Sequence, residues 1–136
     1  QVEFRLELPP ALDRVMVLGH EAWLRRALLI LLDNAFKYTT SGSVTVRAGR
    51  QGDGVVLQVI DTGPGIAPED LPRVFDRFFR ADPARSRGGS GLGLAIASWV
   101  AGLHGGRLTA ESTVGEGSTF SLWLPIYRPA VPQTNS

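Results

Sequence analysis

A single uninterrupted helical segment constrains the fold of this chain more than any other feature. Residues 21–38 contain neither glycine nor proline, and the six residues 27–32 in their middle are all apolar. A helix that is apolar on every side must be covered on more than one side, so it belongs inside a layered domain. Residues 2–8 alternate apolar and charged side chains, which predicts a half-buried strand for one of the layers.

Four further segments predict two β-hairpins. Residues 43–50 and 55–60 alternate or run apolar on either side of a turn rich in glycine and aspartate. Residues 107–112 and 118–124 repeat this arrangement near the end of the chain. Both hairpins are expected to join the first strand in one sheet.

The remaining segments predict the helical layer. Helices are expected at 68–74 and 91–103, a mobile loop at 81–89 and a further short strand at 14–18. This order predicts an α+β fold, a two-layer α/β sandwich. Its sheet would be mixed, mostly antiparallel, with about five strands, and about three helices would cover one face.

The composition is that of one globular domain and excludes several functions. The chain has 136 residues, and we expect one domain at 1–125 followed by a flexible tail at 126–136. The net charge of +1 provides no general attraction to nucleic acid or to an anionic membrane. The absence of cysteine excludes disulfides, thiol nucleophiles and thiolate metal sites.

Three polar side chains share one face at the end of the long helix. Asn34, Lys37 and Tyr38 are spaced i, i+3 and i+4. An amide oxygen suits Mg²⁺, an ammonium group suits a phosphate oxygen, and a tyrosine ring can cover a base. Lys37 is also the only lysine in the chain, which is otherwise rich in arginine. The alternative is an ordinary polar helix end.

An acidic residue follows the apolar strand 55–60. A carboxylate in that position requires a partner, and the exocyclic amine of adenine would donate a hydrogen bond to Asp61. Gly63 and Gly65 would let the adjoining loop lie against a flat ring. The alternative is a plain turn, because Asp-x-Gly sequences are common in turns.

A glycine-rich segment, 88–93, opens the second long helix. Backbone N–H groups at such a helix start can hold phosphate, although the segment matches neither a P-loop nor a dinucleotide-binding fingerprint. Residues 73–87 carry five arginines and two aspartates, a charge of +3, which predicts either a solvated loop or a cationic lid over a triphosphate. Aromatic residues interleave with these arginines, but the low net charge argues against nucleic-acid binding.

Together these segments resemble the catalytic, ATP-binding domain of bacterial sensor histidine kinases, in the Bergerat-fold superfamily. The resemblance covers residues 2–125 and rests on five motifs in the family's order. They are the N box at 31–39, the G1 box at 61–66, the F box at 74–80, the G2 box at 89–94 and the last glycine box at 115–120.

The resemblance implies a role for each matching residue. Asn34 would ligate the Mg²⁺ that bridges the phosphates, Lys37 would contact phosphate, and Tyr38 would lie beside the adenine or ribose. Asp61 would accept the hydrogen bond of the adenine amine, supported by Thr119 directly or through water. The adenine slot would be shaped by Gly63, Gly65 and Ile66.

The same resemblance implies a lid over the phosphates. Arg77 and Arg80 would reach the terminal phosphate, and Phe78 and Phe79 would anchor the lid. The segment that closes on the phosphates would comprise Gly89, Gly91, Leu92 and Gly93.

The resemblance also implies partners. The domain would bind Mg²⁺ and ATP and donate the γ-phosphoryl group to a histidine on a separate dimerisation domain of the same protein, with a response regulator downstream. The fragment would be a monomer and the full-length protein a homodimer, with no nucleic-acid partner. The domain would be cytoplasmic, and its parent anchored in the bacterial inner membrane.

Two features depart from the family or could mislead. Sensor kinases usually carry asparagine where this chain has Ile30, and hydrolytic relatives carry a glutamate base. This predicts a poor ATPase and a weaker Mg²⁺ site. His20 does not match the phosphoacceptor motif and fits a capping or surface position. His104 ends a helix, where a partly charged imidazole suits the dipole.

Other functions remain open at this stage. The same fold serves an anti-sigma-type serine kinase and chaperone, topoisomerase and mismatch-repair ATPases, although the clear F box and the missing glutamate favour the histidine kinase. A degenerate kinase that binds nucleotide as a regulatory module is kept open by Ile30. A third alternative treats the glycines as turns only and predicts no stabilisation by Mg²⁺ and ATP.

Overall fold

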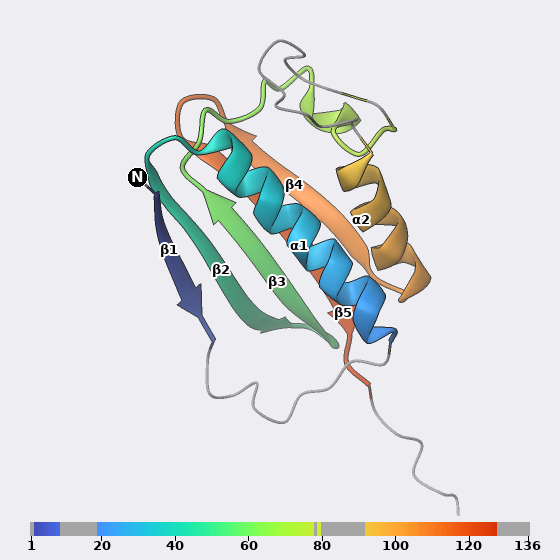
Figure 1. Cartoon of the computed structure of the whole chain (residues 1–136). Helices are drawn as coiled ribbons and strands as arrows, with labels where there is room; N and C mark the ends of the chain where they lie inside the picture. The colour runs from blue at the N-terminus through green and yellow to red at the C-terminus, as the bar shows by residue number, and fades with distance from the viewer. Residues whose placement is uncertain (1, 9–18, 78, 80–91, 128–136) are drawn as a thin grey trace, which may run out of the picture.

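The computed structural model describes residues 2–8, 19–77, 79 and 92–127, and Figure 1 shows their arrangement. The elements follow in the order strand, helix, two strands, short 3₁₀ helix, helix and two strands. They are β1 (Val2–Glu7), α1 (Glu21–Tyr38), β2 (Gly42–Gln51), β3 (Gly54–Asp61), η2 (Leu71–Arg73), α2 (Gly93–Leu103), β4 (Arg107–Thr113) and β5 (Gly117–Pro125).

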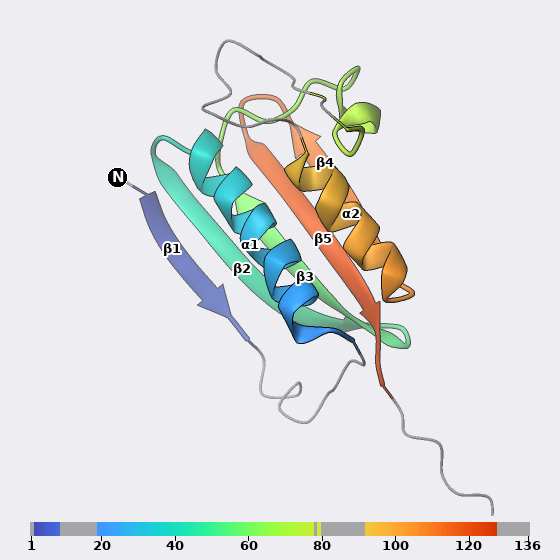
Figure 2. The same ribbon diagram turned by 45° about the vertical axis from the view of Figure 1, so that its right-hand side comes forward.

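The five strands form one sheet in the order β1-β2-β3-β5-β4. β1 is parallel to β2, and the other three pairs are antiparallel. Both α-helices lie on one face of the sheet, as the two views in Figures 1 and 2 agree. The prediction of a two-layer α+β sandwich with a mixed, mostly antiparallel sheet of about five strands is confirmed.

The core lies between the sheet and the two helices. Alternate residues of β5, namely Phe120, Leu122 and Leu124, are buried, because successive side chains of a strand point to opposite faces. On α1 the buried residues recur every fourth position. The buried residues of both helices are small or branched. The buried helical residues are Ala27, Leu31, Ala35, Ala97, Val100 and Ala101.

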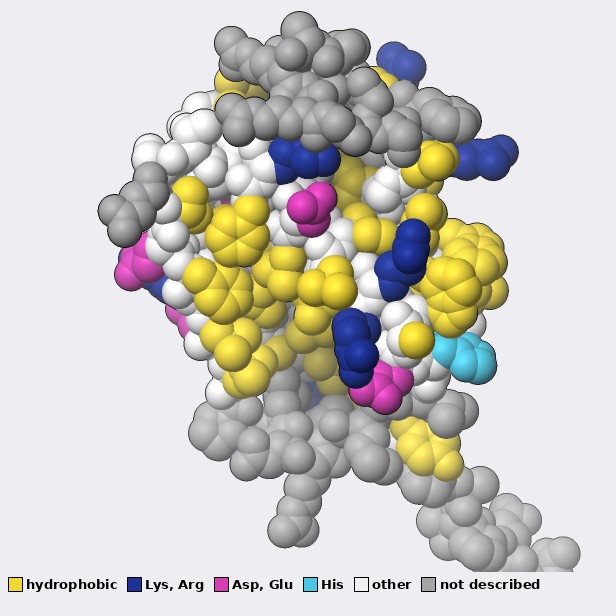
Figure 3. Space-filling model, in the orientation of Figure 1, with side chains coloured by type: hydrophobic (Ala, Val, Ile, Leu, Met, Phe, Trp, Pro, Cys, Tyr) yellow, Lys and Arg dark blue, Asp and Glu magenta, His cyan; other side chains and the backbone are white. Residues whose placement is uncertain are grey.

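The long helix is covered on two sides, as its sequence predicts, and is exposed on a third. Leu29, within the apolar stretch, is 56% exposed, and Phe36 is 42% exposed. The sheet and α2 cover two sides of α1, and the third side faces outward beside β1, where Phe4 and Phe36 pack with ring centroids 6.0 Å apart. Figure 3 shows hydrophobic side chains gathered on this face of the molecule.

Other predicted elements differ from the structure or lie outside the residues that it describes. The helix predicted at 68–74 is only the three-residue η2, with a proline in its first turn. The strand predicted at 14–18 and the loop at 81–89 lie outside the described residues. The Ile126 N–H donates to Asp53 O at 2.9 Å, so the chain is still hydrogen-bonded one residue into the predicted tail.

Within the described part of the chain, no helix is long and apolar enough to cross a membrane.

Candidate nucleotide-binding site

A buried carboxylate occupies the end of β3. Asp61 is the last residue of that strand, is 6% exposed, and lies between Val44 of β2 and Ser118 of β5. Burial raises the pKa of the Asp61 carboxyl, and hydrogen bonds from the backbone N–H groups of Gly63 and Ser118 partly offset this. Since a carboxylate offers about four lone-pair positions, these two donors leave room for another.

The end of α1 lies directly against this carboxylate. A Cβ atom built on Gly63 would lie 3.0 Å from Asp61 Oδ1, 3.0 Å from the Tyr38 carbonyl oxygen and 3.4 Å from Thr39 Oγ1. The Gly63 N–H donates to Asp61 Oδ1 at 2.9 Å. The structure therefore brings the predicted N and G1 boxes into contact, and a side chain at position 63 would crowd both.

One buried hydroxyl beside this contact lacks a partner. Thr39, the residue that caps α1, is 4% exposed. Its Oγ1 is the one buried side-chain N or O atom among the described residues that makes no hydrogen bond. Sequence reasoning assigned no role to Thr39, and no pattern marks its burial, which depends on the loop from β3 folding over the helix end.

The loop after Asp61 is fastened to the turn between β4 and β5. Gly65 has φ +79°, and a Cβ there would collide with the Thr113 carbonyl. The Ile66 N–H donates to Ser112 Oγ at 2.7 Å, and the Gly115 N–H donates to the Pro64 carbonyl at 2.9 Å. The first and last glycine boxes thus form one rigid wall behind the carboxylate.

The register of β5 places a serine, rather than the predicted Thr119, opposite Asp61. Ser118, rather than Thr119, lies opposite Asp61, and Thr119 lies opposite Ile60. Neighbouring strand residues point to opposite faces, so the Thr119 side chain faces away from the helices. Ser118 is 7% exposed, and its Oγ lies 2.9 Å from Ser112 Oγ. The hairpin register, which the turn at 114–117 sets, is the signal that could have identified Ser118.

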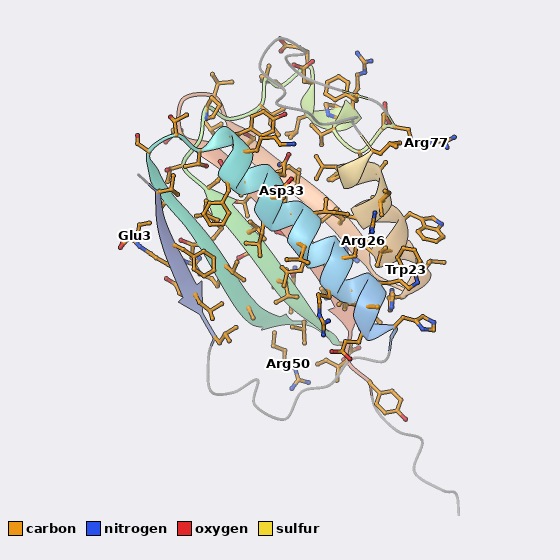
Figure 4. The ribbon with its side chains drawn as sticks, viewed as in Figure 1. Glu3, Trp23, Arg26, Asp33, Arg50 and Arg77 are labelled. Atoms are coloured by element: carbon orange, nitrogen blue, oxygen red, sulfur yellow. The ribbon has the colours of Figure 1, made fainter. Side chains whose placement is uncertain are left out.

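The predicted ligand face of α1 is half-buried. Asn34, Lys37 and Tyr38 all have intermediate exposure. The Lys37 Nζ lies 3.9 Å from Asp33 Oδ2, a loose pairing because Asp33 is largely exposed, as its position in Figure 4 also shows. Among the described residues, the ammonium group of Lys37 therefore has only this weak partner to exchange for a phosphate oxygen.

Ile30 connects this face to the start of α2. A Cβ built on Gly93, the first residue of α2, would lie 3.2 Å from Ile30 Cγ2. Ile30 is thus an apolar packing residue one turn before Asn34. The positive end of the α2 dipole lies over the same stripe of α1, where it can attract an anion.

Apolar and aromatic residues of the F box pack against the core. Val74 is buried, and Phe75 packs edge to face on Phe120 with ring centroids 6.1 Å apart. Phe79 is half-buried with the Arg73 guanidinium 4.8 Å from its ring centroid. Sequence analysis predicted Phe78 and Phe79 as the anchors of the lid and assigned no role to Val74 or Phe75.

The predicted phosphate contacts of the lid fall mostly outside the description. Arg77 is exposed, and in Figure 4 its side chain points away from the body of the molecule. Leu92 is half-buried and precedes α2, where its carbonyl accepts the Ile96 N–H at 2.9 Å. The positions outside the described residues are Phe78, Arg80, Gly89 and Gly91.

The described residues include no group of three or more histidine, aspartate or glutamate side chains that could hold a metal by itself. Asn34 offers one amide oxygen, and Ile30 offers none. Such a donor set fits Mg²⁺ only when phosphate oxygens and water complete its coordination.

This geometry defines a class of protein. A family model described as "Histidine kinase-, DNA gyrase B-, and HSP90-like ATPase" matches residues 19–128, most of the chain. The chain belongs to this family.

Within the family, the chain is similar to several histidine kinases. The sensor-like histidine kinase SenX3 of Mycobacterium tuberculosis (strain ATCC 25618 / H37Rv) is 49% identical over 127 residues, which are 91% of this chain and 30% of the relative. The circadian input-output histidine kinase CikA of Synechococcus elongatus is 46% identical over 105 residues, 75% of this chain and 14% of the relative. The chain therefore spans less than a third of these proteins.

Solved structures of histidine kinases have the same fold as this chain. The mycobacterial sensor histidine kinase MprB superposes with a TM-score of 0.82 at 39% identity, covering 95% of this chain and 86% of that one. Full-length ShkA in complex with AMPPNP gives a TM-score of 0.81 at 33% identity, covering 96% of this chain and 27% of that one. The chain is an ATP-binding domain of the sensor histidine kinase type.

Proposed function

We propose that this domain binds Mg²⁺ and ATP and donates the γ-phosphoryl group to a histidine carried by a separate dimerisation domain of the same protein. The observation that carries the proposal is the buried Asp61 carboxylate beside Gly63 and the end of α1. A desolvated carboxylate with spare acceptor capacity, placed next to a glycine-containing loop, suits the exocyclic amine of a planar base.

The residues near Asp61 would bind the rest of the nucleotide. Tyr38 ends the helix on which Lys37 and Asn34 lie, and Gly93 begins α2 against the same helix. A triphosphate running from Asp61 toward Gly93 would pass a lysine, an amide oxygen and a helix N-terminus. Phosphoryl transfer depends mainly on positioning and charge neutralisation, which these groups supply without a covalent catalyst.

Asn34 would hold Mg²⁺ on the phosphates, where the ion neutralises developing negative charge. Ile30 can neither ligate the ion nor activate water, because its side chain has no polar atom. The isolated domain is therefore expected to hydrolyse ATP far more slowly than ordinary enzymes turn over, and a steady kcat near 1–10 s⁻¹ would contradict this.

The accepting imidazole must come from outside the described domain. Its two histidines lie at the start of α1 and the end of α2, the opposite end of both helices from the Asp61 and Gly93 positions. A helical hairpin bearing the acceptor, a response regulator downstream, a dimeric parent and anchorage in a bacterial inner membrane are part of the proposal, by likeness to sensor kinases.

The test is calorimetric titration of ATP with and without Mg²⁺ into the wild type, D61N and N34A. We expect D61N to weaken binding by about 10-fold or more in both conditions, because a hydrogen bond to a charged group is lost. N34A should weaken binding only when Mg²⁺ is present. Equal affinities for all three proteins would refute the assignment of the site.

Ile30 favours a second candidate, a nucleotide-binding regulatory module without transferase activity. Mixing the domain with the matching helical hairpin and ATP separates the two. Formation of phosphohistidine supports the kinase, whereas tight binding without transfer supports the module.

A further inference from the structure

β1 is an edge strand whose outer backbone is unpaired in the part of the chain that the structure describes. Among these residues it pairs only with β2, so alternate N–H and C=O groups point away from the sheet. Every residue of β1 except Val2 is exposed, and in Figures 1 and 2 the strand forms one border of the sheet. At the other border, by contrast, β4 contributes Leu108 to the buried core. The edge of β1 can therefore accept a further strand.

The side chains on the helix-facing side of β1 are apolar and exposed. Phe4 lies opposite Val44 of β2, a core residue, and therefore points to the same face of the sheet. Leu6 and Leu8 continue the alternation at every second position. These three side chains are 48%, 58% and 59% exposed. Their removal from water would favour association, because burial of apolar surface is the main driving force for it.

The opposite face of β1 carries charges of alternating sign. Arg5 donates to Glu3 within the strand, and Glu7 accepts from Arg47 Nε at 2.7 Å. All four side chains are about half exposed, so these pairs are weak. The guanidinium of Arg5 has further N–H donors and Glu7 has a second oxygen, so each can form another ion pair.

Antiparallel pairing with a second copy of β1 matches these side chains. In the register that places Leu6 opposite Leu6 of the copy, Phe4 lies opposite Leu8. In the same register, Arg5 lies opposite Glu7 on the charged face. Apolar pairs and opposite charges directly across two strands both stabilise the pairing. A register centred on Phe4 also pairs opposite charges but leaves Leu8 outside the paired residues, and one centred on Arg5 brings like charges together.

We propose that two copies of this domain associate through β1, joining their five-stranded sheets edge to edge. Leu6 lies at the two-fold axis, and because the interface is self-complementary, association closes at two copies. The ladder is short, since Pro9 and Pro10 lack N–H groups and follow Leu8 directly. So small an interface gives a weak dimer, which a tether between two copies would strengthen by raising their effective concentration to about millimolar.

The pairing leaves the candidate nucleotide-binding site accessible. Asp61 ends β3, and β2 lies between β3 and β1. The inference therefore goes beyond the proposed function and does not depend on it. ATP affinity should be the same in every β1 variant described below, which makes it a control for correct folding.

Sedimentation velocity without nucleotide tests the dimer. We expect the wild type to shift from monomer toward dimer as its concentration rises from about 10 µM to 1 mM. L6K puts like charges at the centre of the interface and should lower the association constant at least about 10-fold. L103K is the matched control, because Leu103 of α2 is 57% exposed, against 58% for Leu6, and lies away from β1. It should leave the association constant unchanged.

Two charge reversals test the register. R5E alone and E7R alone each bring like charges together and should stay monomeric. Mixed in equal amounts, the two variants should form a heterodimer, because opposite charges meet again at both positions. E3R leaves Glu7 in place, so R5E mixed with E3R should associate at least about 3-fold more weakly than R5E mixed with E7R. Stronger association of R5E with E3R would contradict the register centred on Leu6.

The mixing experiment also separates a surface effect from misfolding, since two misfolded variants would not restore a dimer when combined. A wild type that stays monomeric at about 1 mM overturns the proposal. A wild-type dimer that L6K, R5E and E7R leave intact overturns it as well, because the contact then lies elsewhere. A wild type that dimerises without binding ATP would instead refute the proposed function alone.

Discussion

The two ends of the helical layer contrast in how their polar groups are satisfied. Where α1 begins and α2 ends, the His20 N–H donates to His104 Nε2 at 3.0 Å, and His104 Nδ1 lies 2.8 Å from the Val100 carbonyl. The same end is capped by the edge-to-face pair of Trp23 and Trp99, with ring centroids 5.7 Å apart. The His20 N–H and both ring nitrogens of His104 therefore have partners within the protein.

The opposite end is left incomplete. There Asp61 is buried with a raised pKa and Thr39 is buried without a partner. The same two helices thus have one end whose histidine groups are hydrogen-bonded within the protein and one end that a ligand would complete. The contrast teaches that stability and function are separated along α1, and each prediction below tests one side of that separation.

The largest expected effect comes from the wall behind Asp61. Gly117 has φ +132°, and a Cβ there would collide with the Asp61 carbonyl, whereas Gly115 has φ +84° with open space around it. G117A should therefore lower the free energy of unfolding by about 3 kcal/mol or more, through strain and collision together. G115A, the matched control, should cost about 1 kcal/mol, as measured by denaturant unfolding. Equal costs would show that the wall is not tightly packed.

The end that carries the two histidines should respond in stability alone. H104A removes the acceptor of the His20 N–H and the ring on which Gly19 packs, so it should cost about 1–3 kcal/mol of unfolding free energy. H20A, in which a side chain that makes no cap hydrogen bond is lost, should cost much less. Neither should change the ATP affinity of the folded protein. A loss of affinity in H104A would break the proposed separation of the two ends.

The open end should respond to pH through Asp61. Its pKa is raised by burial, so the folded state holds that proton more tightly than the unfolded chain does. The contribution to stability is fully present below the unfolded pKa and is lost as pH rises through the folded pKa. ATP binding runs the other way, because it requires the carboxylate. Relative to D61N, the wild type should lose stability and gain affinity as pH rises across this window, measured by parallel melts and titrations. Identical pH profiles for the two proteins would contradict the role of burial.

The smallest expected effect concerns Ile30. I30N would place an amide one turn before Asn34 and should strengthen ATP binding a few-fold, only in the presence of Mg²⁺. It should also lower the melting temperature slightly, because Ile30 packs against Gly93. I30V, which keeps an apolar side chain, is the control and should leave the Mg²⁺ dependence unchanged. Strengthening without Mg²⁺ would place residue 30 away from the metal.

The sequence was sufficient for the fold because periodicity is local. The alternation in β5 and the spacing of Ala27, Leu31 and Ala35 mark the two buried faces directly. The outward side of α1 could not be predicted in the same way. Whether Leu29 is covered depends on which elements pack beside the helix, and that is decided by topology.

The site was predictable only in part, for a related reason. Asp61 and Gly63 stand out in the sequence because a carboxylate at a strand end and nearby glycines are unusual locally. Ser118 and Thr39 do not stand out, because their importance comes from strand register and from a loop folding over a helix end. Residues defined by long-range contacts require coordinates.

The most direct test of the central claim is a crystal structure of this domain with Mg²⁺ and a non-hydrolysable ATP analogue. The account predicts the exocyclic amine within about 2.7–3.2 Å of an Asp61 carboxylate oxygen, with the triphosphate directed along α1 toward Gly93. A nucleotide bound elsewhere, or a base that makes no contact with Asp61, would contradict it.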